Sequence, residues 1–237
     1  MCRPDQNAGR KSDVTTTASS TDDRAAEWRK RRLEYVEWIE KTCSEDPGAR
    51  VALRAGLRQN INARSTFAMN RYIARWLSEK SPDSTQRAYF TVAALIASQP
   101  RSVEEAEETG EDPEEPERWG SSLGTAFAEA VAEAPGRDRE MRESAAESRL
   151  NMLTRQSADG IHRSLPASVL YLRQLDVPID WAQLLADLIA WPDHSGRIAR
   201  RWLQDYYRRR HHDGNTDGED NEDAGDFPEQ SDPEDDE

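Results

Sequence analysis

The sequence predicts an all-α fold of two helical bundles, and three observations lead to this prediction. Apolar residues recur at spacings of three and four, whereas no segment alternates cleanly with the period of two that marks a half-buried strand. Prolines and capping residues punctuate the chain where these patterns stop. An acidic run over 102–117 separates two such patterned stretches. We expect about eight or nine helices in total.

The chain divides into five predicted segments. The arm, the acidic loop and the tail contain too few large apolar residues to offset the entropy of ordering, so we expect all three to be disordered. A loop as long as the acidic one is unusual inside one compact domain, which favours two separate units. The segments are a disordered arm 1–23, an N-terminal helical subdomain 24–100, an acidic loop 101–118, a C-terminal helical subdomain 119–212 and an acidic tail 213–237.

Four helices are expected in the N-terminal subdomain. Asp46 and Pro47 form a typical helix start, with an acid at the N-cap and proline at the first helical position. The stretch 84–98 is the most apolar of the chain, which predicts a central core helix, and Trp28 is expected to face the core. The predicted helices cover 24–42, a segment from Pro47 onward, 65–78 and 84–98.

Five helices are expected in the C-terminal subdomain. Leu165-Pro166 and Asp180 are predicted helix starts, and the "PDHSG" stretch is a predicted turn before the last helix. The predicted helices cover 121–134, 138–157, 165–175, 180–191 and 197–212. The predicted buried residues of the last two are Leu184, Leu185, Leu188 and Trp191, then Ile198, Trp202 and Tyr206.

The net charge of −14 conceals a basic folded part. Residues 213–237 contain 13 acids and 102–117 contain nine, and neither segment contains a lysine or arginine. Outside these segments and the arm 1–23, 29 bases face 20 acids, a net charge of +9. Net charge is informative for each predicted domain, so a polyanionic partner is compatible with this chain.

No catalytic constellation is found. Motifs of metalloproteases, redox dithiols, phosphate loops and serine hydrolases are all missing from the sequence. Asp193, His194 and Ser195 are adjacent and cannot adopt the geometry of a triad. His211-His212 is expected to be a solvated helix end, with a weak metal site as the alternative. We expect no enzyme activity, no cofactor and no metal.

The cellular location is expected to be the cytoplasm. No apolar run is long enough for a transmembrane helix, and residues 1–23 lack the apolar stretch of a signal peptide. The two cysteines, Cys2 and Cys43, do not form a disulfide framework, which is typical of a reduced, cytosolic chain.

Arginines at helical spacing are the candidate binding residues. The planar guanidinium suits phosphate oxygens, and the set lies away from the apolar stripes. For any single arginine the alternative is a solvated face with internal ion pairs of little energy. The spacings single out Arg50, Arg54 and Arg58, then Arg149 and Arg155, and finally Arg197, Arg200 and Arg201.

Six stretches, in this order and spacing, resemble a known family. They are "GARVALRAGL" (48–57), "AYFTVAALIASQP" (88–100), "SSLGTAF" (121–127), "ESRLNMLTRQSADGIHRSLPASV" (147–169), "VPIDWAQLLADLIAW" (177–191) and "RIARRWLQDYYR" (197–208). The chain resembles the small subunit of the type I-E CRISPR Cascade complex, the CasB family. The last two stretches are the most specific part of this resemblance.

The resemblance implies a non-catalytic protein of two helical bundles that works inside a crRNA-guided antiviral complex. Two copies are expected head to tail, packed on the backbone and large subunits. Their basic faces are expected to hold the DNA strands of the R-loop, chiefly the displaced strand. The resemblance also implies that the nuclease that cleaves the DNA is a different protein from this small subunit.

The resemblance extends to individual arginines. Matching positions are Arg54, Arg149, Arg155, Arg173, Arg200 and Arg201, the last two preceding the aromatic pair Tyr206-Tyr207. Two positions depart from the family pattern, because Thr125 and the "ASVLY" stretch after Pro166 stand where bases are common. With the helical spacings, the predicted nucleic-acid-binding residues are Arg54, Arg58, Arg149, Arg155, Arg173, Arg197, Arg200 and Arg201.

Two alternatives remain open. The chain could be a purely structural helical adaptor whose arginines contact protein carboxylates, or a helix-turn-helix regulator with its turn at 158–166 or 192–196. The acidic tail has two interpretations as well. It could compete with nucleic acid for the arginines of the last helix, or it could only make the protein soluble.

Overall fold

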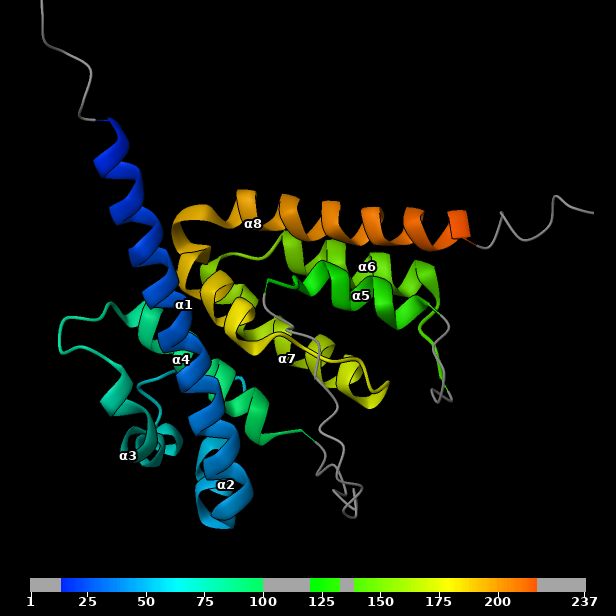
Figure 1. Ribbon diagram of the computed structural model, residues 1–237. Helices are drawn as coiled ribbons and strands as arrows, with labels where there is room; N and C mark the ends of the chain where they lie inside the picture. The colour runs from blue at the N-terminus through cyan, green and yellow to red at the C-terminus, as the bar shows by residue number, and fades with distance from the viewer. Residues whose placement is uncertain (1–13, 100–119, 133–138, 217–237) are drawn as a thin grey trace, which may run out of the picture.

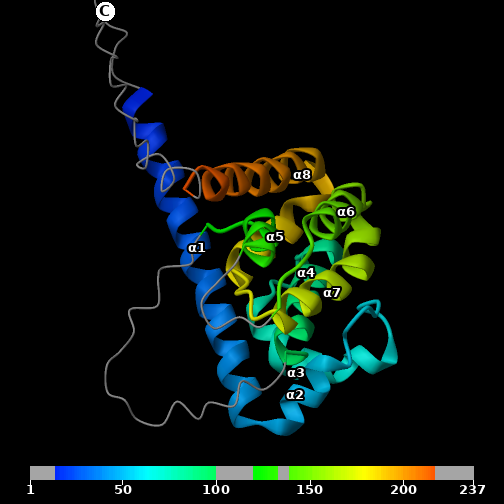
Figure 2. The same cartoon turned by 90° about the vertical axis from the view of Figure 1, so that its right-hand side faces the viewer.

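A computed structural model describes residues 14–99, 120–132 and 139–216, and within these ranges every regular element is a helix. The predicted all-α fold is thus confirmed. Figure 1 shows the arrangement, with the second half of helix α8 (Trp181–Thr216) along the top and α2 (Pro47–Arg54) and α3 (Asn70–Ile73) at the bottom. The turned view in Figure 2 keeps these elements at opposite ends of the molecule.

Helix α1 (Val14–Glu45) is longer than the sequence predicted. Tyr35 and Ile39 are fully buried against the rest of the fold, and the Tyr35 hydroxyl donates a hydrogen bond of 2.7 Å to the carbonyl of Tyr89 in helix α4 (Asp83–Ala97). The helix begins inside the segment 1–23, for which disorder stays a prediction. Once the packed turns have nucleated a helix, each further residue adds one hydrogen bond. Trp28 is 52% exposed, so its predicted place in the core is also wrong.

Helix α2 (Pro47–Arg54) begins as predicted. The carboxylate of Asp46 accepts a hydrogen bond of 2.8 Å from the amide of Gly48. On the next turn Arg50 donates to the carbonyls of Ala97 and Gln99, which lie at the end of helix α4 (Asp83–Ala97). This arginine therefore satisfies terminal carbonyls of α4 and joins the two helices.

The expected helix over 65–78 is broken into three short pieces. They are a 3₁₀ helix η1 (Arg64–Met69), helix α3 (Asn70–Ile73) and a second 3₁₀ turn η2 (Ala74–Trp76). The Thr66 hydroxyl hydrogen-bonds the carbonyls of Ile61 and Ala63 instead of capping a longer helix. Such local side-chain bonds compete with regular helix formation.

Three helices follow residue 120 in the order predicted, with different ends. Helix α5 (Leu123–Val131) is capped by Ser122, and α6 (Glu143–Thr154) is shorter than expected. Helix α7 (Ala158–Gln174) starts seven residues before the predicted start at Leu165. Ser157 caps it, and Pro166 lies inside the helix on its buried side. Proline lacks the N–H that a helix interior needs, and burial of its apolar ring offsets part of that cost.

Helix α8 (Trp181–Thr216) combines the last two predicted helices. Asp180 caps it as predicted, accepting a hydrogen bond of 2.7 Å from the amide of Gln183. The predicted turn over 192–196 is a kink, where Pro192 lies inside the helix and His194 leaves the helical region with φ −133° and ψ 21°. The predicted stripe residues from Leu184 to Tyr206 are buried as expected.

One continuous hydrophobic core includes residues from both halves of the chain. Helices α1 and α4 of the first half both contact α8 of the second. The division into subdomains 24–100 and 119–212 stays a prediction, while the described residues of the two halves pack against each other. The acidic loop 101–118 and most of the tail 213–237 lie outside the described residues.

Helices α5 and α8 pack closely at Gly124. A Cβ atom placed on Gly124 would lie 1.8 Å from the carbonyl oxygen of Trp202 and 2.6 Å from its carbonyl carbon. Both atoms belong to the backbone of α8, so no side-chain rotation can relieve the contact. The glycine in the "SSLGTAF" stretch is therefore required for this close approach.

A buried carboxylate joins the two halves of the kinked α8. Asp187 is 3% exposed and accepts hydrogen bonds from Gln183 Nε2 and Trp202 Nε1, both at 2.7 Å, and from the guanidinium of Arg201. The indoles of Trp191 and Trp202 pack with their ring centroids 5.1 Å apart. Charged and aromatic contacts together set the angle between the two halves.

We predict that Gly124→Ala destabilises the protein by about 3 kcal/mol or more, because the added methyl collides with the α8 backbone. The melting temperature should fall by roughly 10 °C for a chain of this size. Gly196→Ala is the matched control, since a Cβ there meets nothing within 4 Å. Equal melting temperatures for the two variants would contradict the packing argument.

We also predict that Asp187→Ala lowers the free energy of unfolding by about 2 to 4 kcal/mol, because it leaves a buried indole N–H and a guanidinium without their acceptor. Urea denaturation measures this change. Asp193→Ala removes an exposed carboxylate from the same helix and should change stability by less than about 0.5 kcal/mol. Arg201→Ala should fall between the two, because that side chain is 43% exposed.

Candidate nucleic-acid interface

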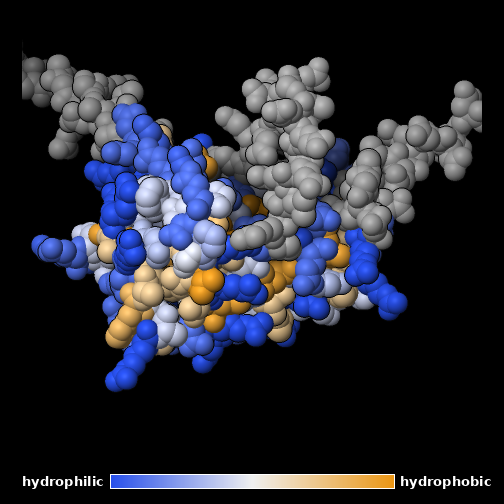
Figure 3. All heavy atoms as spheres, turned by 90° about the horizontal axis from the view of Figure 1, so that it is seen from below, coloured by the Kyte–Doolittle hydropathy of each residue, from blue (hydrophilic) through white to orange (hydrophobic). Residues whose placement is uncertain are grey.

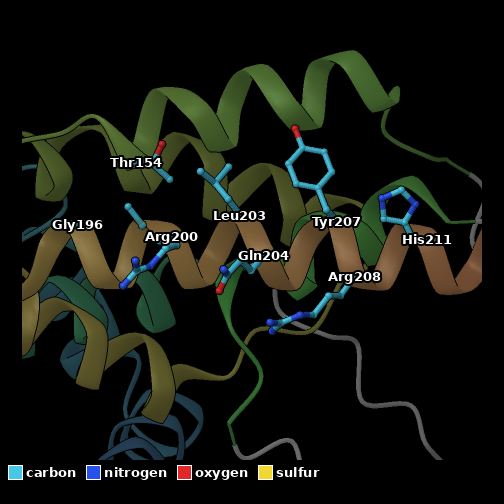
Figure 4. A pocket seen from close by; sticks show the side chains of 9 residues that line it. Thr154, Gly196, Arg200, Leu203, Gln204, Tyr207, Arg208 and His211 are labelled. Atoms are coloured by element: carbon cyan, nitrogen blue, oxygen red, sulfur yellow. The ribbon is translucent and has the colours of Figure 1, made fainter.

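The candidate interface is a groove between α6 and the second half of α8. Its open volume is about 670 Å³. Successive turns of α8 contribute side chains to its lining. The lining residues are Thr154, Gly196, Ala199, Arg200, Leu203, Gln204, Tyr207, Arg208 and His211. We call this set the α8 groove (Figure 4).

The floor and the rim of the α8 groove differ in chemistry. In Figure 4, Leu203 and Tyr207 point toward α6, whereas Arg200, Gln204 and Arg208 point away from it along the edge of α8. Arg200 and Arg208 are exposed. They lie two helical turns apart, about 12 Å along the axis at 1.5 Å per residue. The groove therefore combines an aromatic ring with two cations on one rim.

The aromatic pair Tyr206-Tyr207 is divided between core and surface. Tyr206 is fully buried, and Tyr207 is 41% exposed, with the two ring centroids 5.1 Å apart. Desolvation, followed by the nearby carboxylate of Glu147, raises the pKa of the Tyr207 phenol. Tyr207 thus stays neutral near pH 7 and offers a ring face beside the basic rim.

The structure brings together three of the predicted residues. Arg197 and Arg200 are exposed on α8, and Arg155 is exposed at the end of α6, directly after Thr154 of the α8 groove. Arg201 is on the same helix, but its guanidinium is paired with the buried Asp187. The main contact of Arg201 is therefore structural.

Four other predicted residues lie elsewhere. Arg149 stacks on the ring of Tyr171 in α7 at 4.7 Å, and Arg173 donates a hydrogen bond of 3.0 Å to the carbonyl of Val177. Arg54 ends α2, and Arg58 lies beyond that helix with a positive φ of 61°. The expected helical face of Arg50, Arg54 and Arg58 is therefore wrong, because the helix ends before the third arginine.

Sequence reasoning missed Gln204, Tyr207, Arg208 and His211. Their signal was present in the sequence, because Gln204 and Arg208 follow Arg200 at spacings of four, and Tyr207 and His211 share that side of the helix. The predicted helix over 197–212 was enough to identify them.

The described residues also bear on metal sites, catalytic histidines and membrane helices. No group of three or more His, Cys, Asp or Glu side chains in that part of the chain could hold a metal ion. His162 is buried, its Nδ1 lies 2.9 Å from the Thr91 hydroxyl, and desolvation lowers its pKa to about 4. No helix within the described ranges has the length and apolarity needed to cross a membrane.

Several solved structures are similar to this chain over most of its length. A chain of a CRISPR RNA-guided surveillance complex is 31% identical with a TM-score of 0.68, covering 80% of this chain and 99% of its own length. A chain of such a complex in a pre-nicking state is 32% identical with a TM-score of 0.67, covering 80% of this chain and 98% of its own. CasB from M. ruber, at 22% identity and a TM-score of 0.60, covers 78% of this chain and 97% of its own, which supports the fold.

The family comparison covers the region that holds α2 through most of α8. A search of curated proteins found no match. The family model of the CRISPR-associated protein Cse2 matches residues 49–207, about two thirds of the sequence. This range contains all six stretches on which the resemblance to the type I-E small subunit depends, apart from one residue at each end. The chain belongs to the Cse2 family of CRISPR-associated proteins.

Proposed function

We propose that this chain is the non-catalytic small subunit of a type I-E CRISPR surveillance complex and that it binds nucleic acid through the α8 groove. Similar chains occur in CRISPR RNA-guided surveillance complexes, which supports the assembly partners. Those partners are the backbone and large subunits, a second copy of this chain, and the crRNA-guided target DNA. Its work there is to stabilise the R-loop and the displaced DNA strand.

One observation carries the nucleic-acid part of the proposal. The rim of the α8 groove presents Arg200 and Arg208 on the same side as Gln204, next to the exposed ring of Tyr207. Guanidinium groups suit phosphate oxygens, and aromatic rings stack on bases without regard to sequence. Single-stranded nucleic acid is the ligand class that needs both.

The groove does not depend on a catalytic group. Its side chains include no nucleophile aligned with a base, and His211 is exposed at its far end. The role of the chain is thus to hold strands, and the proposed activity is binding alone. Arg155 and Arg197 extend the same surface, whereas a role in nucleic-acid binding for Arg54, Arg58, Arg149, Arg173 and Arg201 stays a prediction.

The structural-adaptor alternative makes a different claim about the same arginines. If they contact protein carboxylates, binding of free DNA should be weak and only slightly dependent on salt. Phosphate contacts release counterions, so their loss changes the salt slope. The following prediction separates the two functions.

We predict that Arg200→Ala with Arg208→Ala weakens binding of single-stranded DNA about tenfold at low salt, because two charge-assisted phosphate contacts are lost. The slope of log affinity against log salt should decrease by about 1.4, at 0.7 per phosphate. Fluorescence anisotropy over a salt series measures both. Arg24→Ala with Arg163→Ala removes the same charge from exposed positions outside the groove.

Unchanged affinity and slope in the groove variant would favour the adaptor. Circular dichroism at the same temperatures checks that both variants are folded. In the assembled complex, the same groove variant should shorten the lifetime of the R-loop, while the control pair should not.

The acidic tail gives a further prediction. Truncation after Thr216, where α8 ends, removes 12 acids and should raise the affinity of the free subunit for single-stranded DNA. A tethered tail has a local concentration of about millimolar order near α8, but screening beyond about 8 Å keeps its competition partial. The effect should therefore be largest at low salt. Identical binding across the salt series would assign the tail to solubility alone.

A further inference from the structure

A second basic surface lies at the opposite end of the molecule from the α8 groove. We call it the basic end and define it as residues 47–78, which include α2, η1, α3 and η2. This stretch contains six arginines and no acidic residue. Its exposed arginines are Arg54, Arg58, Arg64, Arg71 and Arg75. Figures 1 and 2 both place α2 and α3 far from the second half of α8.

The arginines of the basic end lack anionic partners within the described ranges. None of these five guanidinium groups forms an ion pair there. On α8, by contrast, Arg201 pairs with Asp187 and Arg208 lies 3.4 Å from a carboxylate oxygen of Asp205. Uncompensated like charges on one surface repel one another. The basic end therefore favours an anionic partner from outside these residues.

Side-chain contacts hold part of this surface in place. The guanidinium of Arg75 lies 4.4 Å from the ring centroid of Trp38 and 5.3 Å from that of Trp76. Between the arginines, Val51 is 71% and Phe67 58% exposed. Figure 3, which views the molecule from below, shows hydrophobic residues in orange among hydrophilic ones in blue on this side. A partner of mixed acidic and apolar character fits such a surface.

The end of α4 indicates which anionic segment is nearest. Arg50 of α2 donates to the carbonyls of Ala97 and Gln99, so the chain leaves α4 beside α2. The acidic segment 102–117 begins three residues after Gln99 and contains nine acids and no base. Three extended residues span about 10 Å. Arg54 is one helical turn beyond Arg50, about 6 Å along the axis, and so lies within reach.

We propose that the basic end is a docking surface for the acidic segment 102–117 of the same chain. Helix α8 ends at Thr216, at the opposite end of the molecule, and the acidic segment 213–237 starts in its last turn, which favours 102–117 as the occupant. Because the segment is tethered beside α2, its effective concentration at the basic end is of about millimolar order. The proposal is independent of nucleic-acid binding by the α8 groove.

Zero-length cross-linking of the full chain tests this assignment. Arg54→Lys and Arg64→Lys keep the charge and introduce amines that a carbodiimide can join to a contacting carboxylate. Arg197→Lys on α8 is the matched control. Peptide mass spectrometry should find the amines at positions 54 and 64 joined to 102–117 with about tenfold higher yield than the amine at 197. At 1 M salt, where the screening length is about 3 Å, this excess should disappear.

A mixture of isotope-labelled and unlabelled chains identifies the source of the carboxylates. Links within one isotope class support the proposal, and links only between the two classes overturn it in favour of a second copy. Links from 213–237 overturn the choice of segment. If positions 54, 64 and 197 react alike, the segment does not dock, and the basic end is open to another anion such as nucleic acid. None of these outcomes depends on whether the α8 groove binds DNA.

Discussion

The buried carboxylate of Asp187 is the interaction on which the C-terminal half depends. It lies before the kink of α8, and its donors Arg201 and Trp202 lie after the kink. Removing a charge from water is unfavourable unless the charge is fully hydrogen-bonded, and here Gln183 supplies a third donor. Since the two halves of α8 share this one acceptor, the direction of the second half is fixed. The position of every arginine on that half follows from it.

The fold class and most helices could be predicted because they depend on local patterns. The Asp46-Pro47 start, the Asp180 cap and the core helix around Val92 all follow from spacing and capping chemistry. Helix ends were harder, because they depend on contacts with distant residues. Pro166 predicts a helix start by itself, yet it lies inside α7, where burial of its apolar ring offsets part of the cost of the missing N–H donor.

The candidate site was predictable only in part. Sequence spacing identified arginines, but it could not tell which of them the fold uses internally. Arg201 directly follows Arg200 in the sequence, and Arg173 is, like Arg155, an arginine of the family pattern. Arg201 and Arg173 are used internally because Asp187 and the carbonyl of Val177 lie within their reach. Such partners come from tertiary packing. By contrast, Gln204 and Arg208 could have been predicted, because the helix predicted over 197–212 contains them four and eight residues after Arg200.

The contact between Gly124 and the backbone of Trp202 also affects how the surface of α8 can behave. Because the two backbones touch without an intervening side chain, α8 cannot rotate or shift by one residue without a collision. Along this helix the α-carbons of Arg200 and Arg208 lie about 12 Å apart. A stacked strand rises about 3.4 Å per nucleotide, so this separation corresponds to between three and four phosphates. A rigid helix that presents charges at a fixed interval loses little conformational entropy when a strand is bound.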